Sequence, residues 1–160
     1  MIVIGFDPGL ERVGFGVLRK VGSQITCLEH GLIKTPAGPL GPRLKQIHEE
    51  VDALITKHQP QSIAVEKLFF TKNQTSAMDV AKALGCVLLA VEEHGLGSEE
   101  YSPPQVKQSV VGNGAADKKQ VQFMVTKLLG LKETPKPDDV ADALAIAITH
   151  LMRSGPAKLR

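Results

Sequence analysis

The sequence predicts an α/β protein in which a mixed five-stranded sheet is flanked by helices. Three short apolar segments within residues 2–33 are separated by turn residues, which is typical of hairpins. From residue 44 onward, segments with helical periodicity alternate with short strand-like segments. Early hairpins followed by this alternation favour a mixed sheet covered by helices.

Short apolar runs with turn residues between them predict the first three strands. Residues 2–6 form a run of the buried type that ends at the turn sequence Asp7-Pro8-Gly9. Residues 13–18 follow closely enough to pair with the first run as a hairpin, and residues 25–33 are compatible with a third strand.

Helices predominate in the rest of the chain, with two further strands between them. The fourth strand is predicted at residues 62–65, directly before Glu66, and a fifth near residues 99–102. The segment Ser102-Pro103-Pro104 opens a further element. Apolar residues at helical spacing predict helices at residues 44–55, 76–91, 120–129 and 138–152.

The helix predicted at residues 76–91 is apolar over more than one face. Leu84 and Leu88 lie on its main apolar stripe, which small and apolar neighbours widen. Such a helix is either sandwiched in the core of one domain or half-buried between two subunits. We therefore treat it as the candidate homodimer contact, with burial inside one chain as the alternative.

Length and composition favour one globular domain over residues 1–160, with a short basic tail after about residue 152. No apolar run approaches the roughly 20 residues that cross a bilayer, so we expect no membrane segment. Cys27 and Cys86 lie in apolar stretches, which favours reduced, buried thiols and a cytoplasmic location. The net charge of +2 is too small to indicate nucleic acid by itself.

Basic residues are unevenly distributed along the chain. Between residues 105 and 136 the lysines face few acids, namely Asp117 and Glu133. A solvated surface explains any single lysine of this segment. The lysines are Lys107, Lys118, Lys119, Lys127, Lys132 and Lys136.

Four carboxylates stand out by their positions. Asp7 follows the first predicted strand and Glu66 follows the fourth, and strand ends in such sheets gather where ligands usually bind. Asp139 and Asp142 are three residues apart at the start of the last helix and therefore share a face. Each acid alone has an ordinary explanation, as a turn former, an edge residue or a helix-start acid, but their joint occurrence favours one site.

The last helix gives the clearest sign of a bound cation. Residues 140–148 are apolar except for Asp142, and their alanines permit close approach to a sheet. A buried carboxylate without a partner is costly, so Asp142 needs a cation. Lys136 and Arg153 lie too far along the helix, which leaves a lysine or arginine from elsewhere in the fold, or a divalent metal such as Mg²⁺. Asp138, after Pro137, is expected to be the N-cap.

The sequence lacks the motifs that several common enzyme chemistries require. The sequence has no phosphate-binding loop with a Gly-Lys pair, no complete dinucleotide fingerprint and no serine-hydrolase elbow. Its histidines form no close pair with one another or with a cysteine, which argues against zinc. An oxygen-ligated metal therefore remains the best explanation of the acids.

These motifs together resemble the RuvC family of bacterial Holliday-junction resolvases. The resemblance covers nearly the whole chain in order and spacing, and the motifs are jointly specific although Asp-Pro-Gly alone is weak. They are IGFDPG at residues 4–9, GFGV at 14–17, VEKLFF at 65–70, QVKQ at 105–108 and DVADALA at 139–145.

The resemblance implies an RNase H-like fold and a homodimer that resolves four-way DNA junctions in recombination and repair. By position, Asp7, Glu66, Asp139 and Asp142 would be the catalytic residues and metal ligands. The cofactor would be Mg²⁺, with two ions per subunit and Mn²⁺ as an alternative. Metal-activated water would then make paired symmetric nicks that leave 5′-phosphates.

The resemblance also implies DNA contacts and protein partners. Phe69 would meet unstacked bases, while Lys107 and Lys118 would contact DNA; the match to Lys119 is less clear. We expect one of Phe69 and Phe70 to be exposed, where stacking on a base is worth about 1–3 kcal/mol. RuvA and RuvB, the branch-migration proteins, are the implied partners.

Two other functions stay open on the sequence. One is an RNase H-like nuclease that acts on ribosomal RNA precursors, which would share the fold. The other is a non-catalytic module that binds DNA junctions, although such a module has no need of Asp142 in an apolar helix. Cleavage assays on junction, linear and RNA substrates would separate these functions.

Overall fold

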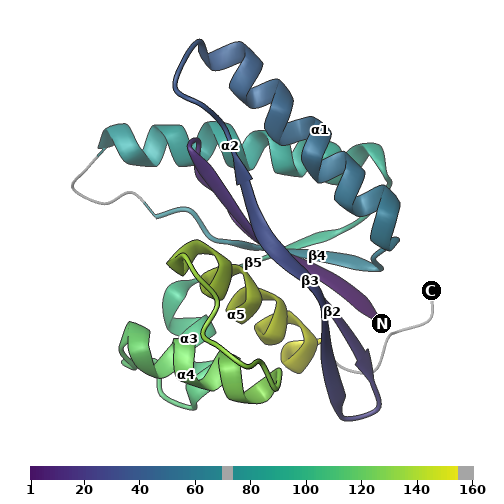
Figure 1. The fold of residues 1–160 in the computed structure, drawn as a ribbon, viewed down its shortest axis with the longest axis vertical. Coiled ribbons are helices and arrows are strands. Elements are labelled where there is room, and N and C mark those ends of the chain that lie inside the picture. Colours follow the sequence, from purple (N-terminus) through teal and green to yellow (C-terminus); the bar gives the residue numbers. More distant parts are fainter. Residues whose placement is uncertain (70–73, 155–160) are drawn as a thin grey trace.

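The computed structural model describes residues 1–69 and 74–154. A sheet lies between two layers of helices (Figure 1). Two helices cover one face, α1 (Leu40–His58) and α2 (Gln74–Glu93). Three helices cover the other face, α3 (Pro103–Val111), α4 (Lys118–Leu128) and α5 (Asp138–Arg153).

The sheet has five strands in the order β3-β2-β1-β4-β5. The first three strands pair antiparallel as consecutive hairpins, whereas β4 runs parallel to β1 and β5 parallel to β4. The predicted mixed sheet flanked by helices is therefore confirmed. The strands are β1 (Ile2–Asp7), β2 (Arg12–Val21), β3 (Gln24–Lys34), β4 (Ser62–Glu66) and β5 (Ser98–Tyr101).

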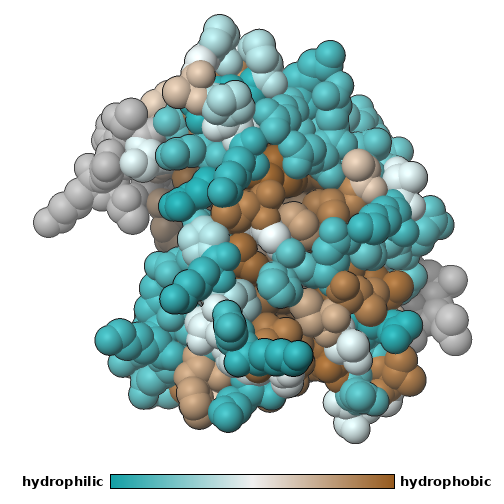
Figure 2. Space-filling view, in the orientation of Figure 1, coloured by the Kyte–Doolittle hydropathy of each residue, from teal (hydrophilic) through white to brown (hydrophobic). Residues whose placement is uncertain are grey.

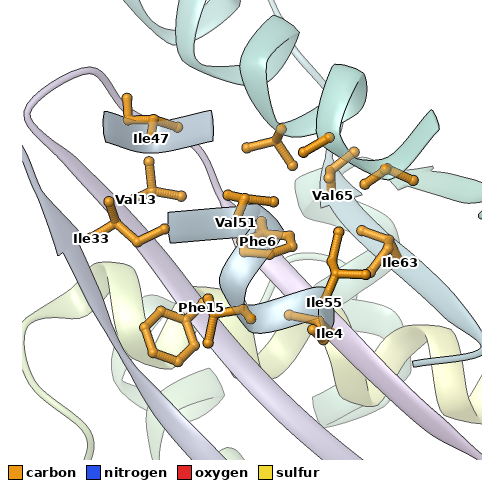
Figure 3. Packing of buried hydrophobic residues seen from close by; sticks show 14 of the residues in the cluster. Ile4, Phe6, Val13, Phe15, Ile33, Ile47, Val51, Ile55, Ile63 and Val65 are labelled. Atoms are coloured by element: carbon orange, nitrogen blue, oxygen red, sulfur yellow. The ribbon is translucent and has the colours of Figure 1, made fainter. Parts of the chain in front are cut away.

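Alternation along β1 fills a core on each face of the sheet. Ile4 and Phe6 pack in the core under α1 and α2, while Val3 packs in the core against α3, α4 and α5. Figure 3 shows Phe6 close to Val51 of α1. Burial of each such large side chain contributes about 1.5–3 kcal/mol, and β1 is buried on both faces because it lies in the middle of the sheet.

Hydrophilic residues cover most of the face in Figure 2, and hydrophobic side chains show in a band between the upper and lower layers of helices. In the described part of the chain, no helix combines the length and the apolar character needed to cross a membrane.

Side-chain caps explain where α3 and α4 begin. The Asp117 carboxylate accepts a hydrogen bond of 2.8 Å from the Gln120 backbone N–H, and the Asp117 backbone N–H donates one of 2.9 Å to the Gln120 side chain. This capping box starts α4 at Lys118, two residues before the predicted start. Ser102 and Gln105 form the same box at α3. The spacing Asp-x-x-Gln in the sequence would have located α4 correctly.

The expected N-cap role of Asp138 is wrong. Pro137 occupies the cap position of α5 without a side-chain hydrogen bond, and Asp138 is the first helical residue. Its carboxylate instead lies 2.9 Å from the Lys118 ammonium of α4. An acid in the first turn still suits the positive end of the helix dipole.

Three glycines let α5 lie directly on the sheet. A Cβ atom at Gly5 of β1 would collide with the backbone carbonyl of Ala143 and lie 2.8 Å from the Ala147 nitrogen. A Cβ at Gly14 of β2 would collide with the carbonyl of Asp139, and one at Gly16 would lie 2.5 Å from the Leu144 side chain. The missing side chains therefore set the height of α5, and of its acids, above β1 and β2.

We predict that Gly5→Ala destabilises the fold by about 1–3 kcal/mol, because the added methyl forces α5 away from the sheet. Gly41→Ala is the matched control, since a Cβ at Gly41 of α1 meets no atom within 4 Å. The control should leave stability unchanged or raise it by up to about 1 kcal/mol. Urea unfolding measures both, and equal effects of the two substitutions would contradict the close-approach argument.

Candidate active site

The first two candidate acids lie on neighbouring strands at the same edge of the sheet. Phe6 of β1 is paired with Val65 of β4 in parallel register, so Asp7 and Glu66, the next residues, end their strands side by side. Both side chains are partly buried. The sequence predicted that these acids lie near each other because each follows the end of a strand.

The other two acids approach the same edge from α5. The contact of the Asp139 carbonyl with Gly14 places the start of α5 over β2, next to β1. Asp142 follows one turn later on the same face of the helix. Electrostatic repulsion from Asp139, Asp142 and Glu66 acts on Asp7, so the four acids form one group, named here the acid cluster.

Burial and crowding raise the affinity of three of the acids, Asp7, Glu66 and Asp142, for protons. Burial and then repulsion by Glu66, Asp142 and Asp139 raise the pKa of Asp7 from 3.8 to about 8. Burial, followed by repulsion from Asp142, raises the pKa of Glu66, against a hydrogen bond with Asp7 that lowers it. Burial also raises the pKa of Asp142, although the nearby Lys118 opposes this effect. Negative charge in the cluster therefore exceeds what its neighbouring basic groups offset.

Two basic side chains already engage the acid cluster. The Arg12 guanidinium at the start of β2 lies 3.3 Å from Asp139 Oδ2, and the Lys118 ammonium lies 3.4 Å from Asp142 Oδ2. Asp142 thus has a lysine partner from elsewhere in the fold, an option that the sequence left open beside a metal. Burial lowers the pKa of Lys118, but its bonds with Asp138 and Asp142 outweigh this and raise it overall. Arg12 was missed because its pairing joins segments far apart in the chain.

A pocket of about 210 Å³ opens beside the acid cluster. Glu66 and Asp142 line it together with Lys107 and Lys118, the two lysines that the sequence singled out. Its remaining walls are apolar side chains of α3, α4 and α5. The pocket therefore brings carboxylates and ammonium groups to one opening, as a site for a phosphodiester requires.

Comparison with known proteins identifies the family. The family described as crossover junction endodeoxyribonuclease RuvC matches residues 3–150. The chain belongs to the RuvC family. The relative from Brevibacillus brevis (strain 47), named crossover junction endodeoxyribonuclease RuvC, is 54% identical over 151 residues, which cover 94% of this chain and 91% of the relative. A relative of the same name from Desulfitobacterium hafniense is 49% identical, over 94% and 92% of the two chains.

Solved structures agree with the sequence comparison. The structure described as T. thermophilus RuvC in complex with Holliday junction substrate superposes with a TM-score of 0.91 at 41% identity, over 95% of this chain and 93% of that one. The structure of Thermus thermophilus RuvC gives a TM-score of 0.88 at 40% identity, over 95% and 94%. The RNase H-like fold implied by the resemblance is therefore confirmed.

The remaining predicted DNA contacts of this RuvC family member lie near the cluster in sequence or space. Phe69 follows β4 three residues after Glu66, and 51% of its surface is exposed, as a base-stacking residue requires. Phe70, the other candidate, lies outside the described residues. Lys119 is exposed at the start of α4, next to Lys118. These roles stay predictions.

The donor set of the acid cluster fits a hard divalent cation. All four side chains offer carboxylate oxygens, the ligands that Mg²⁺ and Mn²⁺ prefer. Burial and the neighbouring acids raise the pKa of Asp7, so a cation bound beside it would relieve the same repulsion that a proton relieves. Among residues 1–69 and 74–154, no three acidic, histidine or cysteine side chains already stand as a formed ligand set. Instead, Arg12 and Lys118 engage Asp139 and Asp142.

We predict that Asp7→Asn stabilises the metal-free protein at alkaline pH. Because the pKa of Asp7 is raised in the folded state to about 8, the native protein binds a proton more tightly than the unfolded chain, and stability falls as pH rises from about 4 to about 8. The variant escapes this loss, so its melting temperature at pH 8 should exceed that of the wild type by about 5 °C.

Thermal melts in a chelator across this pH range test the prediction. Asp79→Asn, which removes a half-exposed carboxylate of α2, is the control and should follow the wild-type curve. Parallel curves of melting temperature against pH for wild type and Asp7→Asn would contradict the prediction, because ionisation of Asp7 would then not lower stability.

Proposed function

We propose that this protein is an endonuclease that resolves four-way DNA junctions by paired symmetric nicks, in DNA recombination and repair. The observation that carries the proposal is the acid cluster at one sheet edge, with Lys107 and Lys118 lining the adjoining pocket. Family membership supports it, since the T. thermophilus relative has been solved with Holliday junction substrate. DNA in the cytoplasm would be its substrate.

The acid cluster would hold Mg²⁺, with two ions per subunit and Mn²⁺ as the alternative. Bound metal would activate water and stabilise the leaving oxygen of the phosphodiester. Asp7 and Glu66 would supply fixed ligands, because strand pairing holds the backbone at the ends of β1 and β4. Asp139 and Asp142 would exchange their bonds with Arg12 and Lys118 for the cation, which frees two basic groups beside the cluster.

The lysines of the pocket would orient the DNA strand. Lys107 lines the pocket from α3 and Lys118 from α4, so a phosphate at the opening could contact both walls. Such contacts position the backbone and carry no sequence information. Phe69, exposed three residues after Glu66, would stack on a base that the junction leaves unpaired.

We predict that Asp7→Asn, Glu66→Gln, Asp139→Asn and Asp142→Asn each reduce junction cleavage at saturating Mg²⁺ by at least about 1000-fold, the scale of a lost transition-state interaction. Junction binding should stay equal or become tighter, because a negative charge near phosphate is removed. Glu49→Gln on α1, a solvent-exposed acid, is the control and should cut normally.

Cleavage of four-way, linear and RNA substrates with and without Mg²⁺ checks both the proposal and these variants. Selective metal-dependent nicking of the junction supports the proposal. Preferred cleavage of structured RNA would point to an RNA-processing nuclease, and tight junction binding without cleavage would point to a binding module. Normal cutting by any of the four variants would remove that residue from the metal site.

We infer a homodimer because a junction needs two cuts on opposed strands and each chain has one acid cluster. The candidate contact is α2, where Met78 is 59% and Leu89 is 54% exposed. Leu84 instead packs in the core of its own chain, and Leu88 is partly buried beside it. One side of α2 thus packs in the core of its own chain, and the other side is exposed. RuvA and RuvB are the proposed further partners.

We predict that Leu89→Glu converts the protein into a folded monomer, because it places a charge on the exposed side of α2. Sedimentation should show a halved mass with an unchanged melting profile, and junctions should be nicked once. Leu84→Glu is the contrasting variant and should unfold the chain, since it buries a charge in the core. A dimer that survives Leu89→Glu would move the interface elsewhere.

A further inference from the structure

The outer side of α4 carries an exposed aromatic residue between two lysines. Lys119, Phe123 and Lys127 are four residues apart, so they lie on one side of the helix, and we name them the α4 stripe. Phe123 is 58% exposed, and both lysines are exposed. The opposite side of α4, with Val121 and Val125, packs in the core. Core packing therefore does not account for the stripe.

The charge of α4 favours an anionic partner. The helix contains three lysines and no acidic residue within Lys118–Leu128. Lys118 forms ion pairs with Asp138 and Asp142. Among the described residues, no carboxylate lies within ion-pair distance of Lys119 or Lys127. The Lys127 ammonium lies 5.6 Å from the centre of the Phe123 ring, which keeps this lysine beside the aromatic face.

The position of the stripe connects it to the active site. Lys119 directly follows Lys118, which lines the pocket beside Glu66 and Asp142. From Lys119 the stripe runs about 12 Å along the helix to Lys127. One strand of duplex DNA presents a phosphate about every 3.4 Å along its axis, so a stripe parallel to that axis spans about three to four phosphates. A strand held at the pocket could continue along α4 on the outside of its helical layer (Figure 1).

We propose that the α4 stripe binds the sugar-phosphate backbone of a duplex arm of the junction, as an extension of the active site that rests on the proposed function. Lys119 and Lys127 pair with phosphates, and Phe123 packs against the deoxyribose between them. The stripe adds affinity for the arm and takes no part in the chemical step. An acidic protein partner would also fit two lysines, and the test distinguishes it.

The test measures junction binding against salt concentration, in a chelator to prevent cutting, for Lys127→Ala and Phe123→Ala. Lys127→Ala should flatten the dependence of log binding constant on log salt by about 0.9, the value for one lost phosphate contact. Phe123→Ala should weaken binding by about threefold to tenfold with an unchanged slope. Both should cut at the wild-type rate once the junction is saturated with protein and Mg²⁺.

Matched controls come from α1, on the other face of the sheet. Lys45→Ala removes an exposed lysine, and Leu40→Ala removes an exposed apolar side chain. Both should bind and respond to salt as the wild type does. Neutral methylphosphonates placed along one arm give a second readout: they should weaken the wild type at the contacted phosphate and leave Lys127→Ala unaffected there.

Failure of the stripe proposal and failure of the proposed function give different results. A wild type that neither binds nor cuts junctions contradicts the proposed function itself. If the wild type binds and cuts but Lys127→Ala and Phe123→Ala match their α1 controls, the stripe does not bind DNA, and a protein partner is the remaining explanation. A lower cutting rate at saturation with unchanged binding would also overturn the proposal, because the stripe would then position the reacting strand.

Discussion

The close approach of α5 to β1 and β2 is the constraint on which the site depends. Gly5, Gly14 and Gly16 present no side chain to α5; the helix backbone fills the space over Gly5 and Gly14, and the Leu144 side chain fills that over Gly16. Strand pairing fixes Asp7 and Glu66, but only this contact brings Asp139 and Asp142 to them. The same contact buries part of the carboxylate surface, so the packing that assembles the carboxylates also makes negative charge on Asp7 and Asp142 costly.

The electrostatics of the site follow from that arrangement. Burial and mutual repulsion favour the protonated form of Asp7, while Arg12 and Lys118 neutralise Asp139 and Asp142 in part. Under the proposed function, a divalent cation would replace both the protons and these internal partners, so it would bind without a preformed ligand cage. The stability lost to crowded carboxylates would thereby be recovered once a cation is bound.

The sequence predicts much of this structure because its strongest signals are local. Apolar runs locate the strands, helical spacing locates α1, α2 and α5, and the strand ends identify Asp7 and Glu66. Two local signals were misread: the capping box at Asp117 starts α4 earlier than predicted, and Pro137 takes the cap position expected of Asp138.

Other features could not be read from one segment at a time. The pairing of Arg12 with Asp139 and of Lys118 with Asp142 depends on how α4 and β2 meet α5 in space. The periodicity of α2 places Leu84 and Leu88 on one wide apolar stripe and does not show which side of the helix is exposed. In the fold, Leu84 is buried, whereas Met78 and Leu89 are exposed. Tertiary packing decides such questions, because a helix periodicity shows a stripe without showing what covers it.

Burial and repulsion favour the protonated form of Asp7, and a bound cation would displace that proton. Calorimetric titration of Mg²⁺ into the metal-free protein at pH 7, in buffers of different ionisation enthalpy, counts the protons released on binding. With the pKa of Asp7 near 8, the account predicts release of about one proton per chain, and little release from Asp7→Asn. Mg²⁺ binding to the wild type without proton release would contradict it, because the carboxylates would then be fully ionised beforehand.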